Sequence, residues 1–173
     1  MKPCVIWLTG LPSSGKTTLA GELGKAIRPS ILLDGDRVRE GLCKGLGFSD
    51  EGRAENIRRA AEVAVLACES GITPICSFVS PTIAARAAAR GIVETWGFRF
   101  VEVFLDVPVF VCEARDPKGL WLKARSGLLP GLTGVGSPYE RPKNPEILVP
   151  WVPLGEAEKL VLHSLELEPE YSI

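Results

Sequence analysis

Histidine, methionine and any surplus of charge are scarce in this chain. Its 173 residues include one histidine and one methionine, and 20 basic side chains nearly balance 21 acidic ones, for a formal net charge of −1. Such a balance provides no overall basic field, so nucleic acid is not an expected partner and any anion binding must be local. Five scattered cysteines, without a C-x-x-C pair, favour neither a zinc site nor a disulfide framework. The pattern is typical of reduced thiols in a cytoplasmic protein.

Long hydrophobic runs are absent as well. The longest uncharged stretch, which includes residues 71–85, contains two prolines and is too short to cross a bilayer, so no membrane association is expected. The N-terminus enters a predicted strand almost at once, so no secretory leader is expected either. With 46% hydrophobic and 24% charged residues, residues 1–173 are expected to form a single domain with a sizeable core.

A glycine-rich motif is the most informative feature that the sequence does contain. The run Gly10–Thr17 fits G-x-x-x-x-G-K-[ST], a loop whose backbone N–H groups hold the phosphates of ATP or GTP. The motif requires a buried strand before it and a helix after it, and the sequence predicts them at residues 4–9 and 16–27. We expect Lys16 to reach the β- and γ-phosphate oxygens and the Thr17 hydroxyl to bind Mg²⁺. The residues expected to bind ATP are Gly10, Leu11, Pro12, Ser13, Ser14, Gly15, Lys16, Thr17, Thr18 and Arg115.

Strands and helices alternate along the rest of the chain. Further strands are predicted at 31–33, 73–79, 98–105 and 147–149, and helices at 53–70, from 81 towards 94, at 108–115 and at 155–167. This alternation predicts an α/β protein with the three-layer P-loop NTPase fold, a central parallel sheet with helices on both faces. Residues 116–145, rich in glycine, proline and charge, exceed the usual loop length, so we predict that they form a mobile lid.

Polar residues that follow the predicted strands indicate a second, anionic substrate. Asp36 is placed to orient an attacking hydroxyl or to bind Mg²⁺ through water, and Arg39, three residues later, to bind an anion. Phe48 is a candidate for stacking on a base, with Arg53 and Asn56 as partners for polar groups. No N-K-x-D motif for guanine is present, which favours an ATP-dependent kinase over a GTP-driven switch.

The order and spacing of these motifs resemble those of the adenylylsulfate kinase (APS kinase) family. Its members transfer the γ-phosphoryl group of ATP to the 3′-hydroxyl of adenosine 5′-phosphosulfate (APS). The resemblance covers nearly the whole chain and is far more specific than the phosphate loop alone. The matching segments are the phosphate loop, LDGD at 33–36, the run 47–58, SFVSP at 77–81, EVFLDVP at 102–108, RDPKGL at 115–120, PYE at 138–140 and NPEI at 144–147.

The resemblance implies roles for individual residues. Asp36 would orient the 3′-hydroxyl, and Lys118 would enter from the lid towards the reacting phosphates. Ser80 aligns with a serine sometimes assigned as a phosphorylated intermediate, but direct in-line transfer needs only positioning and charge stabilisation, so a hydrogen-bonding role is expected. Mg²⁺ would accompany ATP as the cofactor, held by Thr17 and, through water, by Asp36. The implied catalytic residues are Lys16, Asp36, Ser80 and Lys118, and the implied APS-binding residues are Asp36, Arg39, Phe48, Arg53, Asn56, Val79, Ser80, Lys118 and Leu132.

The chain departs from the family pattern in three places. Thr82-Ile83 stands where the family usually has Tyr-Arg, a lost cation for which Arg86 is a partial substitute. Leu132 stands where the family has a second aromatic residue over the acceptor adenine, and residues 136–137 replace an acidic pair. The donor side is unaffected, so these departures bear on the identity of the acceptor.

Two other functions stay open on the sequence alone. One is a kinase of the same fold that acts on another nucleotide-like anion, and the other is a nucleotide-binding subunit without turnover. The intact Lys16, Thr17 and Asp36 argue against the second. Because the family often forms dimers, a homodimer is a further expectation, with Trp121 or Trp151 as exposed interface residues.

Overall fold

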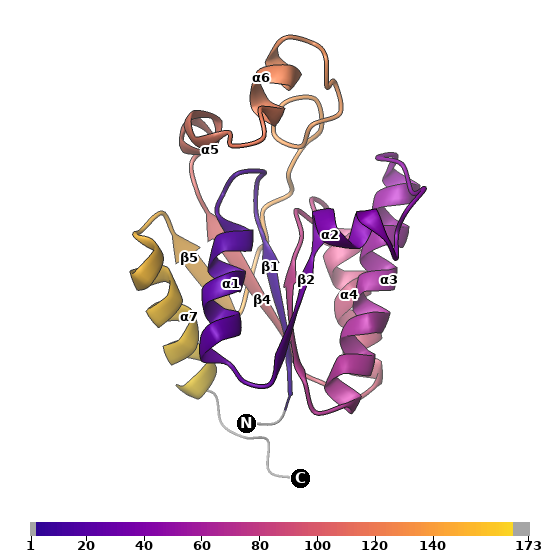
Figure 1. Ribbon diagram of the computed structural model, residues 1–173, viewed down its shortest axis with the longest axis vertical. Helices are drawn as coiled ribbons and strands as arrows, with labels where there is room; N and C mark the ends of the chain where they lie inside the picture. Colours follow the sequence, from indigo (N-terminus) through magenta and orange to yellow (C-terminus); the bar gives the residue numbers. More distant parts are fainter. Residues whose placement is uncertain (1–2, 168–173) are drawn as a thin grey trace.

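The chain folds as a parallel β-sheet between two layers of helices (Figure 1). The computed structural model describes residues 3–167. The strands are β1 (Val5–Thr9), β2 (Ser30–Asp34), β3 (Thr73–Ser77), β4 (Phe100–Asp106) and β5 (Ile147–Pro150). The helices are α1 (Lys16–Ala26), α2 (Gly35–Glu40), α3 (Asp50–Glu69), α4 (Ile83–Thr95), α5 (Val109–Arg115), α6 (Leu120–Arg125) and α7 (Leu154–Leu167). Within the described residues, the strand order is β2-β3-β1-β4-β5 and every neighbouring pair is parallel, which confirms the predicted three-layer α/β fold.

The central strand β1 contributes to two hydrophobic cores. Successive side chains of a strand point to opposite faces of the sheet. Ile6 and Leu8 therefore join the core under α1 and α7, whereas Val5 and Trp7 join the core under α3 and α4. All five residues of β1 are buried, which is why this strand reads as a continuous apolar run in the sequence.

Two of the element boundaries that differ from the predicted ones reflect local hydrogen bonds or backbone geometry. Helix α3 begins at Asp50, three residues earlier than predicted, because Ser49 caps it: the Ser49 hydroxyl accepts from the Gly52 N–H at 3.2 Å. Strand β3 ends at Ser77, and the chain then leaves the sheet towards Ser80, which has a positive φ of 37°.

The segment predicted as a lid, residues 116–145, contains a helix that the sequence interpretation did not anticipate. Helix α6 lies within it, beyond the carboxyl edge of the sheet (Figure 1). Its Trp121 is 1% exposed, and the indole N–H donates to the carbonyl oxygen of Pro12 at 3.3 Å. The lid segment therefore contacts the phosphate loop. Because Trp121 is buried, the expectation that it is an exposed interface residue is wrong.

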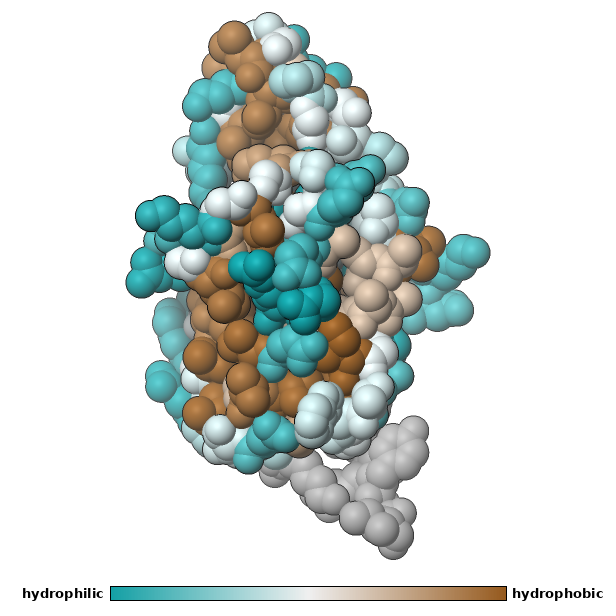
Figure 2. All heavy atoms as spheres, turned by 90° about the vertical axis from the view of Figure 1, so that its right-hand side faces the viewer, coloured by the Kyte–Doolittle hydropathy of each residue, from teal (hydrophilic) through white to brown (hydrophobic). Residues whose placement is uncertain are grey.

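The outer side of α3 and α4 mixes hydrophobic and hydrophilic residues (Figure 2). The hydrophobic ones include Leu66 on α3, 61% exposed, while the exposed positions of α4 include Ala84, Ala87 and Ala88. Among the described residues, none of the helices is both long enough and apolar enough to span a membrane.

Candidate active site

A cavity of about 990 Å³ opens at the carboxyl edge of the sheet. In a parallel α/β sheet this edge is where ligands bind, because the loops that follow the strands converge there. Of the site residues predicted from the sequence, all but Gly10 and Leu11 line this cavity. The fold thus brings together the phosphate loop, the turn after β2, the start of α3, the chain after β3 and the lid segment.

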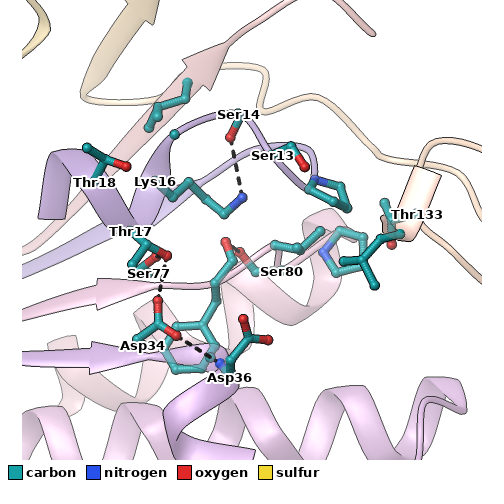
Figure 3. Close-up of a pocket in the computed structure, with 18 of the residues that line it drawn as sticks. Ser13, Ser14, Lys16, Thr17, Thr18, Asp34, Asp36, Ser77, Ser80 and Thr133 are labelled. Atoms are coloured by element: carbon teal, nitrogen blue, oxygen red, sulfur yellow. Dashed lines mark hydrogen bonds between the residues drawn. The ribbon is translucent and has the colours of Figure 1, made fainter. Parts of the chain in front are cut away.

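In the phosphate loop, the Lys16 ammonium group is hydrogen-bonded to two backbone oxygens and one side-chain oxygen. Lys16 Nζ donates to the carbonyl oxygens of Gly10 at 3.0 Å and Leu11 at 2.7 Å. It also donates to Ser14 Oγ at 3.3 Å, the hydrogen bond drawn in Figure 3. Gly15 has a φ of 100°, a conformation that favours glycine. Burial lowers the pKa of Lys16 to about 8. Phosphate oxygens beside the ammonium group would favour its charged form and raise that pKa.

Asp34, which was not among the predicted site residues, joins the phosphate loop to the end of β2. Its Oδ2 accepts from Thr17 Oγ1 at 2.6 Å, and its Oδ1 accepts from the Asp36 N–H at 3.0 Å, which caps helix α2 (Figure 3). The signal in the sequence is an acidic residue at the carboxyl end of the strand that follows the phosphate loop. Thr17, Asp34 and Asp36 supply the oxygen donors that Mg²⁺ prefers, so the donor set fits this ion.

An ion pair crosses the cavity between Asp36 and Lys118. The Lys118 Nζ contacts Asp36 Oδ2, and this hydrogen bond raises the pKa of Lys118. Lys118 lies just before α6 in the lid segment, whereas Asp36 lies on α2. Two of the residues predicted to be catalytic therefore meet directly.

Arg53 links the start of α3 to the lid segment. Its Nη1 donates to Thr133 Oγ1 at 2.8 Å and its Nη2 to the Gly131 carbonyl oxygen at 2.7 Å, while Nε donates to the Phe48 carbonyl oxygen at 2.9 Å. The Phe48 ring is 68% exposed, and the Arg39 guanidinium lies 4.5 Å from its centroid. An aromatic face and two cations thus line one wall of the cavity.

Asn56 provides a buried hydrogen-bonding group without a protein partner. It is 4% exposed, and its Oδ1 accepts no hydrogen bond from the described residues. An unsatisfied buried carbonyl is unfavourable, so this oxygen is suited to accept a hydrogen bond from a ligand in the cavity.

Ser80, in contrast, has its hydroxyl group occupied by the protein. Its Oγ accepts from Trp7 Nε1 at 3.1 Å and donates to Thr9 Oγ1 at 3.0 Å. It is 2% exposed and lines the cavity beside Val79. Across the cavity, Leu132 is 9% exposed and is part of the core around α6.

A second wall of the cavity, beyond the phosphate loop, was missed in the sequence. It is apolar and consists of the end of β5 and the residues that follow this strand. Arg115 extends this wall towards the phosphate loop, where its Nη1 donates to the Ser14 carbonyl oxygen at 3.3 Å. The sequence did contain a signal for this wall, because its residues lie at and directly after the end of the last predicted strand, where ligands bind in such sheets. The wall contains Val149, Pro150, Trp151, Val152, Leu154 and Ala157.

The expectation that Arg86 substitutes for a lost acceptor-binding cation is wrong. Arg86 is 3% exposed, does not line the cavity, and pairs with Glu102 through Nε and Oε1 at 2.7 Å. Ile83 also lies outside the cavity, and its backbone N–H donates to Glu140 Oε2 at 2.7 Å. Of the three departures from the family pattern, Leu132 is the one that contacts the cavity.

One cavity on a parallel sheet contains both the phosphate loop and the wall formed by Phe48, Arg39 and Arg53. This arrangement defines a P-loop kinase, an enzyme that moves a phosphoryl group between a nucleotide and a second bound substrate. Among solved structures, a gluconokinase from Sinorhizobium meliloti 1021, 18% identical with a TM-score of 0.66, shares this fold.

The chain belongs to the adenylylsulphate kinase family, whose model matches residues 2–150. The adenylyl-sulfate kinase of Aeromonas salmonicida is 51% identical over 84% of this chain and 76% of that protein. The adenylyl-sulfate kinase of Emericella nidulans is 50% identical over 95% of this chain and 86% of that protein. The Mycobacterium tuberculosis APS kinase CysC, solved in complex with AMPPNP and APS, superposes with a TM-score of 0.90 at 42% identity, covering 95% of this chain and 98% of that one.

Proposed function

We propose that this protein transfers the γ-phosphoryl group of ATP to the 3′-hydroxyl of APS, giving 3′-phosphoadenosine 5′-phosphosulfate and ADP. The observation that carries the proposal is that Phe48, Arg53 and the unsatisfied Asn56 Oδ1 line the same cavity as the phosphate loop. An aromatic face, a cation and an amide oxygen suit the base, the anionic groups and a polar edge of a nucleotide.

On the donor side, the N–H groups of the phosphate loop and Lys16 Nζ would hold the β- and γ-phosphates. Lys16 would exchange its bonds to the Gly10 and Leu11 carbonyl oxygens for phosphate oxygens, and its charge would stabilise the transition state. Thr17, with Asp34 and Asp36, would hold Mg²⁺, which neutralises negative charge on the β- and γ-phosphates. The apolar wall after β5 and Arg115 would contact the adenine of ATP.

On the acceptor side, Asp36 would accept a hydrogen bond from the 3′-hydroxyl and orient it towards the γ-phosphate. Lys118 pairs with Asp36 in this structure and lies within reach of the same space, so it would move to the transferring phosphoryl group. Ser80 would keep its hydroxyl bonded to Trp7 and Thr9 and shape the pocket, because in-line transfer needs no phosphoserine.

The experiment that tests the proposal is incubation of the purified protein with ATP, Mg²⁺ and APS, with ADP and the 3′-phosphorylated product followed by chromatography. We expect both products in equal amounts. ADP formation with another nucleotide but not with APS would instead support a kinase for a different acceptor. Leu132, which replaces an aromatic residue of the family pattern and lines the cavity, would then be the relevant difference. Tight ATP binding without acceptor-dependent ADP would support a non-catalytic subunit.

The setting of the enzyme is part of the proposal. We expect a cytoplasmic protein, a view supported by five cysteines that are all buried and form no disulfide within the described residues. A homodimer stays a prediction. Trp151 is 52% exposed but also lines the cavity, so an interface there would approach the ATP site. Light scattering at several protein concentrations measures the oligomeric state.

A further inference from the structure

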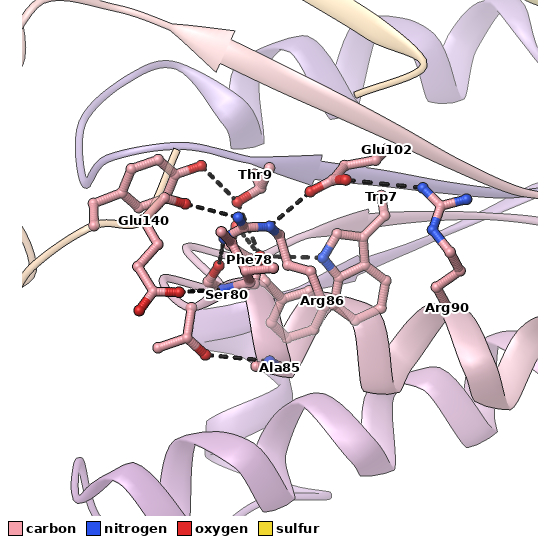
Figure 4. A network of polar contacts seen from close by, with 12 residues as sticks. Trp7, Thr9, Phe78, Ser80, Ala85, Arg86, Arg90, Glu102 and Glu140 are labelled. Atoms are coloured by element: carbon pink, nitrogen blue, oxygen red, sulfur yellow. Dashed lines mark hydrogen bonds and ion pairs between the residues drawn. The ribbon is translucent and has the colours of Figure 1, made fainter. Parts of the chain in front are cut away.

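A buried ion pair lies behind the wall of the cavity that follows β3. Arg86 on α4 is 3% exposed and Glu102 on β4 is 9% exposed, and they meet at 2.7 Å (Figure 4). Neither side chain lines the cavity. Well-packed apolar residues often stabilise a protein as much as a buried ion pair does, so stability alone gives little reason for this pair. The remaining hydrogen bonds of Arg86 indicate a second role for the pair.

The other donors of the Arg86 guanidinium bind two backbone carbonyl groups. Nη1 donates to the Ser80 carbonyl oxygen at 2.7 Å, and Nη2 donates to the Glu140 carbonyl oxygen at 2.7 Å. Ser80 belongs to the wall of the cavity, whereas Glu140 belongs to the end of the lid segment. One planar group therefore sets the distance between these two parts of the chain.

Ser80 needs such support because its backbone is strained. Its φ of 37° lies in the left-handed region, which residues other than glycine seldom adopt. A strained residue persists only where its surroundings hold it from several sides. Arg86 holds the Ser80 carbonyl group, while Trp7 and Thr9 hold its hydroxyl group.

The end of the lid segment is fastened to the same wall and to the phosphate loop. The Glu140 N–H donates to the Pro81 carbonyl oxygen at 2.8 Å. Thr9 Oγ1 donates to the Val79 carbonyl oxygen at 2.8 Å, so in its 2.9 Å contact with Tyr139 the tyrosine hydroxyl is the donor. Thr9 directly precedes the phosphate loop. The network thus connects the lid segment, the wall at Val79–Pro81 (the acceptor wall) and the start of the phosphate loop.

We infer that Arg86, held by Glu102, is a positioning residue for the acceptor: it fixes Val79–Pro81 and the end of the lid segment at the separation from the phosphate loop that APS binding requires. The inference rests on the proposed function. It depends on a planar group that directs two N–H donors to carbonyl oxygens while its Nε pairs with Glu102, an arrangement that arginine has and lysine lacks. A lysine at this position keeps the charge but not the geometry.

The test compares Arg86→Lys with Arg90→Lys. Arg90 lies one turn further along α4, and its Nη2 is 3.8 Å from the other carboxylate oxygen of Glu102, but its hydrogen bonds go to Glu94, Phe100 and Glu146. It makes none to the acceptor wall or the lid segment. We expect Arg86→Lys to raise the KM for APS about ten-fold and to leave the KM for ATP within a factor of about two, because misplacement of a binding wall is costly. Arg90→Lys should change neither.

A spectroscopic readout separates positioning from a loss of folding. The Trp7 indole N–H donates to Ser80, so its ¹H–¹⁵N resonance, assigned with Trp7→Phe, should shift in Arg86→Lys and stay in place in Arg90→Lys. Tyr139→Phe, which removes only the bond to Thr9, carries the kinetic test if Arg86→Lys does not fold, with the same expected rise in the KM for APS. An unchanged KM for APS in a folded Arg86→Lys or Tyr139→Phe protein would overturn the inference while the proposed function stands. Absence of APS turnover in the wild-type protein would overturn the proposed function itself.

Discussion

The guanidinium group of Arg53 donates to the hydroxyl of Thr133 at 2.8 Å, across 80 positions of sequence. The same group also binds the Gly131 carbonyl oxygen, so its two Nη atoms both hold the lid segment. In the proposed function Arg53 also binds APS. Acceptor binding and the placement of the lid therefore share one side chain, and each is expected to affect the other.

The first prediction concerns this shared side chain. Arg53→Ala should raise the KM for APS about a hundred-fold, because it removes a charged group with several hydrogen bonds, each worth about 1.5–3 kcal/mol. The turnover number at saturating APS should fall much less. Steady-state kinetics with APS varied at saturating ATP measures both. Arg58→Ala is the matched control, because Arg58 lies on the same helix and pairs with Glu55 and Glu62, and its side chain does not line the cavity. Equal losses of turnover and APS affinity would contradict the acceptor role of Arg53.

The second prediction is a pH dependence of ATP binding. Burial lowers the pKa of Lys16 to about 8, so in the free protein Lys16 loses its charge as the pH rises above that value. Bound phosphates favour the charged form, so binding above that pH requires uptake of a proton, and the Kd for ATP should increase by up to ten-fold per pH unit, or about 1.4 kcal/mol. Titration calorimetry between neutral pH and about pH 9.5 measures this trend. Lys16→Met should bind ATP weakly and lack the dependence, and a wild-type Kd that is constant over this range would disprove the prediction.

The third prediction assigns a metal role to Asp34. Asp34→Asn should raise the Mg²⁺ concentration that gives half-maximal activity about ten-fold, because a neutral amide is a poorer partner for the ion and its shell. Asparagine caps helices about as well as aspartate, so the thermal midpoint should change little. Activity measured against Mg²⁺ at fixed ATP, together with calorimetric melting, separates the two effects. A lowered melting temperature with an unchanged Mg²⁺ requirement would show that Asp34 acts only as a cap.

The fourth prediction concerns the exposed aromatic ring of Phe48. Phe48→Leu should raise the KM for APS about ten-fold, since stacking of a base on an aromatic side chain contributes about 1–3 kcal/mol. Its effect on stability should be small, because the ring is 68% exposed. Phe110→Leu, at 66% exposure on α5, is the comparison that should leave the KM for APS unchanged. If both substitutions alter that KM alike, Phe48 has no specific part in acceptor binding.

Much of the scaffold could be predicted from the sequence, because its signals are local. The bounds of the strand Val5–Thr9 were predicted to within one residue, since burial on both faces of a parallel sheet demands an unbroken apolar run. The phosphate loop was found for a similar reason: its glycines and lysine act within one turn of chain. Helix α6 was missed, because six residues flanked by glycines and charges carry too little periodicity.

The parts of the site that depend on distant contacts could not be predicted in this way. Asp34 acts through Thr17, and Arg86 acts through Glu102 and two carbonyl groups, and only the folded sheet brings these together. From the sequence, Arg86 was expected to substitute in part for a lost acceptor-binding cation, because nothing local in the alanine-rich helix indicates its buried partners. The ion pair between Asp36 and Lys118 was expected only as two separate roles.

The bond from the Trp121 indole to the Pro12 carbonyl oxygen places a natural fluorophore where the lid segment meets the phosphate loop. Trp7 is also buried, but it lies in the sheet, and Trp96 and Trp151 are both more than half exposed. A soluble quencher such as acrylamide would therefore silence the two exposed indoles first and leave the emission of the buried pair. Any opening of the lid segment would add Trp121 to the quenched fraction, so the unlabelled protein is equipped to report this movement during turnover.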